Sequence, residues 1–132
     1  MKKILIVEDQ YETRKLISIA LRLSPFELIE APNGVDAIQA AREQSPDIML
    51  LDIVMGDGMD GFQVCKRIKS DPSLKHIYVI LVSGLSAPEN FRMGEFCGAD
   101  AYFVKPFRLA RLAEVVTNHA RLKGTFVREA TP

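Results

Sequence analysis

Short, largely apolar runs recur along the chain and are separated by longer segments of mixed character. Residues 3–7, 48–51, 78–82 and 101–104 form such runs, and β-branched residues are common in them. Runs of this length predict strands that are buried on both faces of a sheet. Residues 27–31 alternate polar and apolar side chains instead, which predicts a half-exposed strand at a sheet edge.

The segments between these strands carry apolar residues at helical spacing. Asn33 is the expected N-cap of the second helix, and prolines follow the expected ends of the first three helices. The predicted helices cover about residues 11–23, 34–44, 62–70, 87–96 and 109–120. Parallel strands need crossover connections, so five strands alternating with five helices predict a parallel sheet covered on both faces. The expected fold is a doubly wound α/β domain.

Composition limits the class of protein further. A chain of 132 residues suits one domain, and its 17 basic and 17 acidic side chains give a formal net charge of zero. We therefore expect no nucleic-acid and no membrane partner. Cys65 and Cys97 have no metal-ligand spacing and are expected to be buried apolar residues. Without a signal-peptide pattern or a membrane-spanning run, we expect a reduced, cytoplasmic protein with its domain at 1–123 and a flexible tail at 124–132.

Acidic residues stand directly after two of the predicted central strands. Glu8 and Asp9 follow the run 3–7, and Asp52 follows the run 48–51. Ligands of doubly wound sheets bind beyond the carboxyl ends of the strands, so these three carboxylates are expected to meet there. Clustered carboxylates repel one another and offer hard oxygen ligands, which favours a small divalent cation, Mg²⁺ above all.

Two further polar side chains stand at the ends of other predicted strands. Ser83 follows the run 78–82, and Lys105 follows the run 101–104. An ammonium group and a hydroxyl can hold the oxygens of a phosphoryl group, and a carboxylate can attack phosphorus to form an acyl phosphate. The pattern therefore predicts phosphoryl chemistry at Asp52, with Mg²⁺ and Lys105 screening the approaching negative charges.

From about residue 3 to residue 120, the chain resembles the receiver domain of bacterial two-component response regulators, in particular the chemotaxis type of single-domain receiver. Five motifs carry the resemblance, in chain order: Glu8-Asp9, Asp52, Ser83-Gly84, Tyr102 and Lys105-Pro106-Phe107. The resemblance implies a three-layer, flavodoxin-like fold with five parallel strands in the order 2-1-3-4-5 and five flanking helices. It also implies a donor of phosphate, either a sensor histidine kinase or a histidine phosphotransfer protein.

The resemblance assigns roles to individual residues as well. Asp52 would be the phosphoacceptor, and Ser83 and Lys105 would hold the phosphoryl oxygens. Tyr102 matches an aromatic switch residue whose rotation toward the space near Ser83 accompanies activation. The implied readout surface consists of the helix at 87–96, the strand at 101–104 and the helix that follows, and its partner is an unidentified downstream protein or a missing effector domain.

The resemblance also implies a set of metal ligands: Asp9 and Asp52 directly, Glu8 chiefly through water, and the backbone carbonyl of Val54. The loop after these residues departs from the family pattern, because Gly56 replaces the usual proline after Met55 and the loop is one residue longer. We expect this loop to be looser than in relatives. Asp57 and Asp60 are candidates to approach the site.

Two other classes of protein use similar parts. A Mg²⁺-dependent phosphohydrolase with an aspartyl-phosphate intermediate usually carries a second acid two residues after its nucleophile, where this chain has Val54. An FMN-binding, flavodoxin-like carrier needs a Ser/Thr-rich loop after the first strand, where this chain has Glu8 and Asp9. The expected function remains a switch that assists its own phosphorylation and dephosphorylation and has no separate turnover substrate.

The sequence also bears on how long a phosphorylated state lasts. Val54 and Leu85 stand two residues beyond Asp52 and Ser83, and both have apolar side chains. Neither side chain can orient a water molecule for attack on an acyl phosphate. We therefore expect a comparatively long-lived phosphorylated form.

Overall fold

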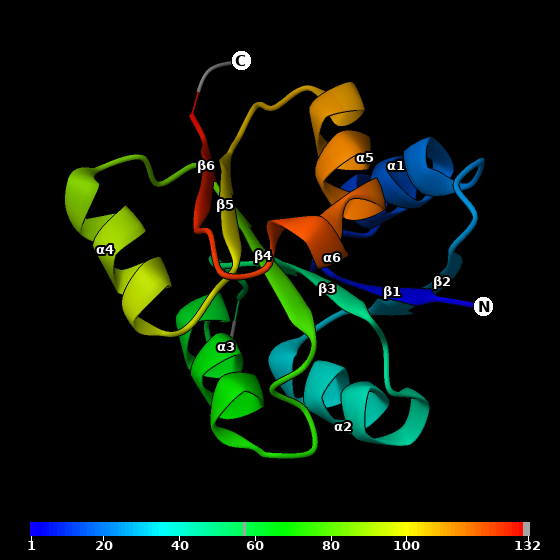
Figure 1. The fold of residues 1–132 in the computed structure, drawn as a ribbon, viewed down its shortest axis with the longest axis horizontal. Helices are drawn as coiled ribbons and strands as arrows, with labels where there is room; N and C mark the ends of the chain where they lie inside the picture. Colours follow the sequence, from blue (N-terminus) through cyan, green and yellow to red (C-terminus); the bar gives the residue numbers. More distant parts are fainter. Residues whose placement is uncertain (57, 131–132) are drawn as a thin grey trace.

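The centre of the molecule is a sheet of six parallel strands, in a computed structural model that describes residues 1–56 and 58–130. The strands follow the order β2-β1-β3-β4-β5-β6 (Figure 1). Their bounds are β1 Lys3–Val7, β2 Glu27–Ala31, β3 Ile48–Asp52, β4 Tyr78–Ser83, β5 Ala101–Val104 and β6 Val127–Glu129. Strand order reverses at β1 and β3, which confirms the doubly wound, flavodoxin-like class.

Helices cover both faces of this sheet and make a three-layer molecule. Their bounds are α1 Tyr11–Leu21, α2 Gly34–Gln44, α3 Gly61–Ser70, α4 Pro88–Phe96, α5 Leu109–Thr117 and α6 His119–Leu122. α2, α3 and α4 lie on one face, and α1, α5 and α6 lie on the other (Figure 1). Val64 and Phe91 belong to the apolar cluster of the first face, and Ile17 and Leu112 belong to that of the second. The two clusters hold the strand ends in fixed positions.

Burial along the strands follows the expected pattern. All residues of β3 and β4 are buried, as predicted for strands with helices on both faces. β2 pairs with β1 alone and is mostly half-buried. The prediction of an edge strand at residues 27–31 is therefore confirmed.

Side-chain caps begin two of the helices. Asn33 caps α2 as predicted, because its Oδ1 accepts a hydrogen bond of 2.8 Å from the Asp36 N–H. Asp60 begins α3 with a capping box: its Oδ1 accepts from the Gln63 N–H, and Gln63 Oε1 accepts from the Asp60 N–H, both at 2.9 Å. Asp60 was a candidate to approach the site, but it caps a helix and does not belong to the carboxylate cluster found in the described part of the chain.

Two predictions about the end of the chain need correction. The sheet has a sixth strand, β6, where five strands were expected, and this strand lies within the segment 124–132. The expected helix at 109–120 is divided into α5 and α6 at Asn118, whose backbone leaves helical geometry and whose Nδ2 donates to the Glu114 carbonyl. A three-residue strand shows no measurable period in sequence, and its pairing depends on the distant β5.

The length and hydropathy of a helix decide whether it can span a membrane. None of the helices in the described part of the chain combines the length and apolar character needed to cross a lipid bilayer. The expected boundary between a domain at 1–123 and a tail remains a prediction.

Candidate functional site

The carboxyl ends of β1 and β3 bring the three predicted carboxylates together. The strands pair in parallel with Val7 opposite Leu51, so the residues that follow leave the sheet side by side. One carboxylate oxygen from each of Glu8, Asp9 and Asp52 lies within 4.8 Å of the others. Residues far apart in sequence thus form one acidic cluster at the edge that the fold class assigns to ligands.

Glu8 and Asp52 form the buried part of this cluster. Their exposed fractions are 3% and 7%. Burial, followed by the hydrogen bond and the charge of neighbouring Asp52, raises the pKa of the Glu8 carboxyl to about 7. Burial disfavours the charged form of an acid, and a second carboxylate nearby disfavours it further. A positive charge close to this pair would therefore favour its ionised form.

Asp9 is exposed and is held by the loop that follows β3. Its Oδ2 accepts a hydrogen bond of 2.9 Å from the Gly56 N–H. That bond is the main cause that lowers the pKa of the Asp9 carboxyl, because a donor to a carboxylate favours its charged form. Met55 is buried beside this contact. Asp57, the other acid expected near the site, lies outside the described residues.

Lys105 supplies a positive charge from the end of β5. Its Nζ lies 3.2 Å from Glu8 Oε1 and 3.4 Å from Asp52 Oδ2. Its backbone N–H donates to the Ser83 carbonyl at 2.8 Å, which fixes the start of the lysine side chain beside β4. The structure therefore brings Lys105 to the same carboxylates that the sequence predicted it would meet.

Ser83 and Tyr102 are linked through the backbone of Leu85. Ser83 is buried at the end of β4, and its Oγ accepts a hydrogen bond of 3.1 Å from the Leu85 N–H. The Tyr102 hydroxyl donates to the Leu85 carbonyl at 2.7 Å. Tyr102 is fully buried in β5. The two predicted switch residues therefore bind the N–H and the carbonyl of one residue, Leu85.

Cavity sizes indicate what kind of ligand the cluster can accept. The cavity beneath Glu8, Asp52 and Lys105 measures about 10 Å³, so bulky groups cannot enter behind the carboxylates. A larger hollow of about 990 Å³ lies between α2 and α3, and its lining includes none of the candidate site residues Glu8, Asp9, Asp52, Ser83, Tyr102 and Lys105. Ligands of the cluster must approach from solvent. Val54, two residues after Asp52, is 63% exposed.

The sequence pattern identified the side chains of the site but missed its backbone contacts. The Gly56 N–H holds Asp9, and the Leu85 N–H and carbonyl connect Ser83 with Tyr102. Every residue except proline has these groups, so residue type carries little signal for them. For Leu85, the sequence supported a prediction only from its apolar side chain.

Comparison with known proteins gives a consistent result. Residues 4–117 match the response regulator receiver domain family. The chain is 35% identical over 121 residues to the polar-differentiation response regulator DivK of Brucella anthropi, a match that covers 89% of this chain and 95% of DivK. It is also 35% identical over 121 residues to the response regulator PleD of Caulobacter vibrioides, covering 92% of this chain. The chain spans only 26% of the length of PleD.

A solved structure extends the comparison to three dimensions. The chemotaxis protein CheY4 of Vibrio cholerae superposes on this chain with a TM-score of 0.82 at 26% sequence identity. The superposition covers 89% of this chain and 98% of CheY4. The likeness therefore extends over most of this chain and nearly all of CheY4.

Proposed function

The chain belongs to the response regulator receiver family, and from this membership we propose that Asp52 is the residue that accepts the phosphoryl group. Receiver domains of this family are phosphoryl-accepting switches in two-component signalling. The observation that supports Asp52 is its place at the end of the central strand β3, 7% exposed and 3.4 Å from Lys105 Nζ. The rigid, buried strand fixes the direction of this carboxylate.

Phosphoryl transfer to Asp52 from a phosphohistidine donor is a single displacement. One Asp52 oxygen forms a bond to phosphorus while the bond from phosphorus to the donor nitrogen breaks, and the departing imidazole takes up a proton. Lys105 remains beside Asp52 and attracts the phosphoryl oxygens electrostatically. Ser83 can turn its hydroxyl away from Leu85 and donate to one of these oxygens.

The donor set at this site fits Mg²⁺. It offers three hard carboxylate oxygens in one cluster, and burial together with the neighbouring Asp52 carboxylate raises the pKa of Glu8, so a further positive charge at the cluster would favour its ionised form. In our proposal, Asp9 and Asp52 would hold the ion directly, Glu8 would do so chiefly through water, and the Val54 carbonyl would complete the protein ligands. A bound ion supplies positive charge that offsets the charge of the arriving phosphoryl group.

The same proposal implies a protein that donates the phosphoryl group and a downstream partner that binds the phosphorylated chain. Receiver domains interact with histidine kinases or phosphotransfer proteins and with downstream partners, and we infer that such a protein donates to Asp52 in the cytoplasm. Phosphorylation then alters the surface formed by α4, β5 and α5, through Ser83 and Tyr102. The change alters binding to another protein and produces no turnover of a separate substrate.

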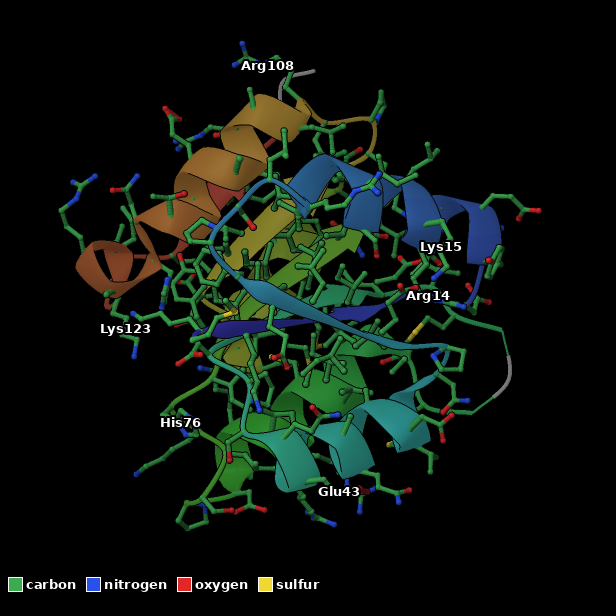
Figure 2. All side chains as sticks on the ribbon, turned by 90° about the vertical axis from the view of Figure 1, so that its right-hand side faces the viewer. Arg14, Lys15, Glu43, His76, Arg108 and Lys123 are labelled. Atoms are coloured by element: carbon green, nitrogen blue, oxygen red, sulfur yellow. The ribbon has the colours of Figure 1, made fainter. Side chains whose placement is uncertain are left out.

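Surface charge gives no support to direct nucleic-acid binding. Arg108 and Lys123 project from opposite ends of the α5–α6 arm (Figure 2). Arg111, between them, is paired with Glu114 at 2.8 Å and with Glu129 at 3.0 Å. Dispersed and neutralised basic side chains do not form the continuous positive surface that nucleic acids require.

Beryllofluoride, a noncovalent mimic of the phosphoryl group, tests the proposal without a partner protein. Full-length chain with Mg²⁺ and beryllofluoride should show amide shifts at the ends of β1, β3, β4 and β5. Asp52→Asn should lose these shifts, whereas Asp36→Asn, at an exposed position of α2, should keep them. Absence of shifts in the parent, or shifts retained in Asp52→Asn, would contradict the assignment.

A further inference from the structure

The segment after α6 returns to the sheet and occupies the outer edge of β5. β6 pairs in parallel with β5, with Ala101 opposite Val127 and Tyr102 opposite Arg128. The Val127 N–H donates to the Asp100 carbonyl at 3.0 Å. β6 therefore covers the strand edge between α4 and α5, where it is visible beside β5 in Figure 1.

Alternate side chains of this segment contact opposite faces of the sheet, as the period of a strand requires. Phe126 packs against the apolar cluster on the α4 side, and Val127 packs against the cluster on the α5 side. Arg128 and Glu129 continue this alternation. The segment therefore packs against the apolar clusters on both faces of the sheet, in addition to pairing with the edge of β5.

The two charged residues each have a defined partner on a flanking helix. The guanidinium of Arg128 lies over the ring of Phe91 in α4, 5.2 Å from its centroid, which is a favourable cation–π distance. Glu129 Oε1 lies 3.0 Å from Arg111 Nε in α5, and both side chains are partly buried. β6 thus links α4 to α5 across the end of β5.

A continuous set of contacts connects β6 with the phosphoryl site. The ring of Phe91, which contacts Arg128, lies 4.8 Å from the ring of Tyr102, centroid to centroid. The Tyr102 hydroxyl donates to the Leu85 carbonyl, and the Leu85 N–H donates to Ser83 Oγ. Each of these groups is thus in contact with the next from the edge of the sheet to a residue beside Asp52.

We propose that the segment Phe126–Glu129 is an internal ligand of the α4–β5–α5 surface, and that its docking is coupled to the occupancy of the phosphoryl site through Phe91, Tyr102 and Leu85. The inference rests on the function proposed for Asp52. A phosphoryl group that draws the Ser83 hydroxyl away from Leu85 breaks the last contact of the series. The support for Tyr102 and Phe91 then changes, and β6 loses part of its binding surface.

Coupling of this kind acts in both directions. If phosphoryl binding weakens the docking of β6, then weakened docking of β6 must favour phosphoryl binding by the same factor. The docked segment also occupies the strand edge and the two helix contacts that a protein partner of this surface needs. Release of β6 therefore exposes the surface at the time when the switch is on.

Hydrogen exchange on the full chain tests the first direction. With Mg²⁺ and beryllofluoride, the Val127 amide should exchange about two- to fivefold faster than with Mg²⁺ alone, the range expected when contacts of this strength are lost. The amides of β2, at the far edge of the sheet, should not change and serve as the internal reference. Equal or slower exchange at Val127 would overturn the inference.

Substitutions in β6 test the reverse direction. Glu129→Gln and Arg128→Ala should each lower the beryllofluoride concentration at half-saturation, by up to about fivefold. Glu114→Gln is the matched control, because it removes the other ion pair of Arg111 without altering β6. The coupling would be overturned if neither β6 variant lowered the beryllofluoride concentration at half-saturation, or if the control lowered it equally. Failure of the parent to bind beryllofluoride at all would instead contradict the role of Asp52.

Discussion

Two exposed apolar residues stand two positions after Asp52 and Ser83, and we expect their lack of a basic group to lengthen the lifetime of an acyl phosphate at Asp52. Val54 and Leu85 are 63% and 39% exposed, and neither offers a base for water. Leu85→Glu should therefore lose phosphate about 10- to 100-fold faster than the parent, because a carboxylate there can act as a general base. Release of radiolabelled phosphate from the purified, phosphorylated protein measures the rate.

A matched variant separates the charge of the new side chain from the change in its shape. Leu85→Met keeps an apolar side chain of similar volume and leaves the backbone bonds to Ser83 and Tyr102 available. Its rate of phosphate loss should equal that of the parent. Equal or faster loss from the parent than from Leu85→Glu would contradict the expected long lifetime.

The two cysteines make a second prediction at the scale of single residues. Burial raises the pKa of the Cys65 thiol to about 12 and also raises that of Cys97. A thiol is a nucleophile only as the thiolate, which forms as the pH rises through the pKa. At pH 8, iodoacetamide should therefore label neither cysteine quickly in the native protein, and both after unfolding. Mass spectrometry measures the extent of labelling over time. Fast labelling of native Cys65 would contradict its buried, inert state.

The functional side chains could be predicted because each one follows an apolar strand. Glu8, Asp52, Ser83 and Lys105 all stand where such a run ends, and the fold class brings those ends to one edge. Direct contacts were not predictable in the same way. The distance from Lys105 to the carboxylates and the bond from Gly56 to Asp9 depend on loop conformation, which the hydrophobic pattern does not encode.

At the scale of elements, the start of α3 lies unusually close to the end of β3. A Cβ added at Gly61 would lie 2.5 Å from the Asp52 carbonyl oxygen and 2.6 Å from Ile53 Cα. Gly61→Ala should therefore move α3 or β3 and destabilise the fold by about 1–3 kcal/mol. Chemical denaturation monitored by circular dichroism measures the free energy of unfolding.

Gly84→Ala is the control for this substitution. Apart from its chain neighbours, no heavy atom of the described residues would lie within 4 Å of a Cβ at Gly84, so the free energy of unfolding of Gly84→Ala should stay close to that of the parent. Because Asp52 is itself the residue that Gly61 contacts, Gly61→Ala should also reduce phosphoryl uptake. Parent-like stability of Gly61→Ala would show that the contact can relax without cost.

Element boundaries show which parts of the fold the sequence encodes locally. Asn33 was predicted to cap α2 because capping chemistry is local to a few residues. β6 was not predicted, since only three residues form it and its stability comes from β5, Phe91 and Arg111. The division between α5 and α6 also has a local cause, at Asn118, but an asparagine in a helix does not always interrupt it.

At the scale of the whole molecule, the alternation of buried strands and amphipathic helices was sufficient to predict the doubly wound sheet. Parallel strands require crossovers of one hand, which leaves few arrangements for such a pattern. The position of the acidic cluster at the carboxyl edge then follows. What the pattern could not supply was the sixth strand, and with it the cover over β5 whose docking we propose is coupled to the phosphoryl site.

Incubation of the full chain with Mg²⁺ and acetyl phosphate, followed by intact mass spectrometry, tests the central claim most directly. The parent and Asp36→Asn should gain the mass of one phosphoryl group, and peptide mapping after borohydride reduction should locate it at Asp52. Asp52→Asn should gain nothing. No mass gain in the parent, or a gain retained in Asp52→Asn, would contradict the claim that Asp52 is the phosphoacceptor.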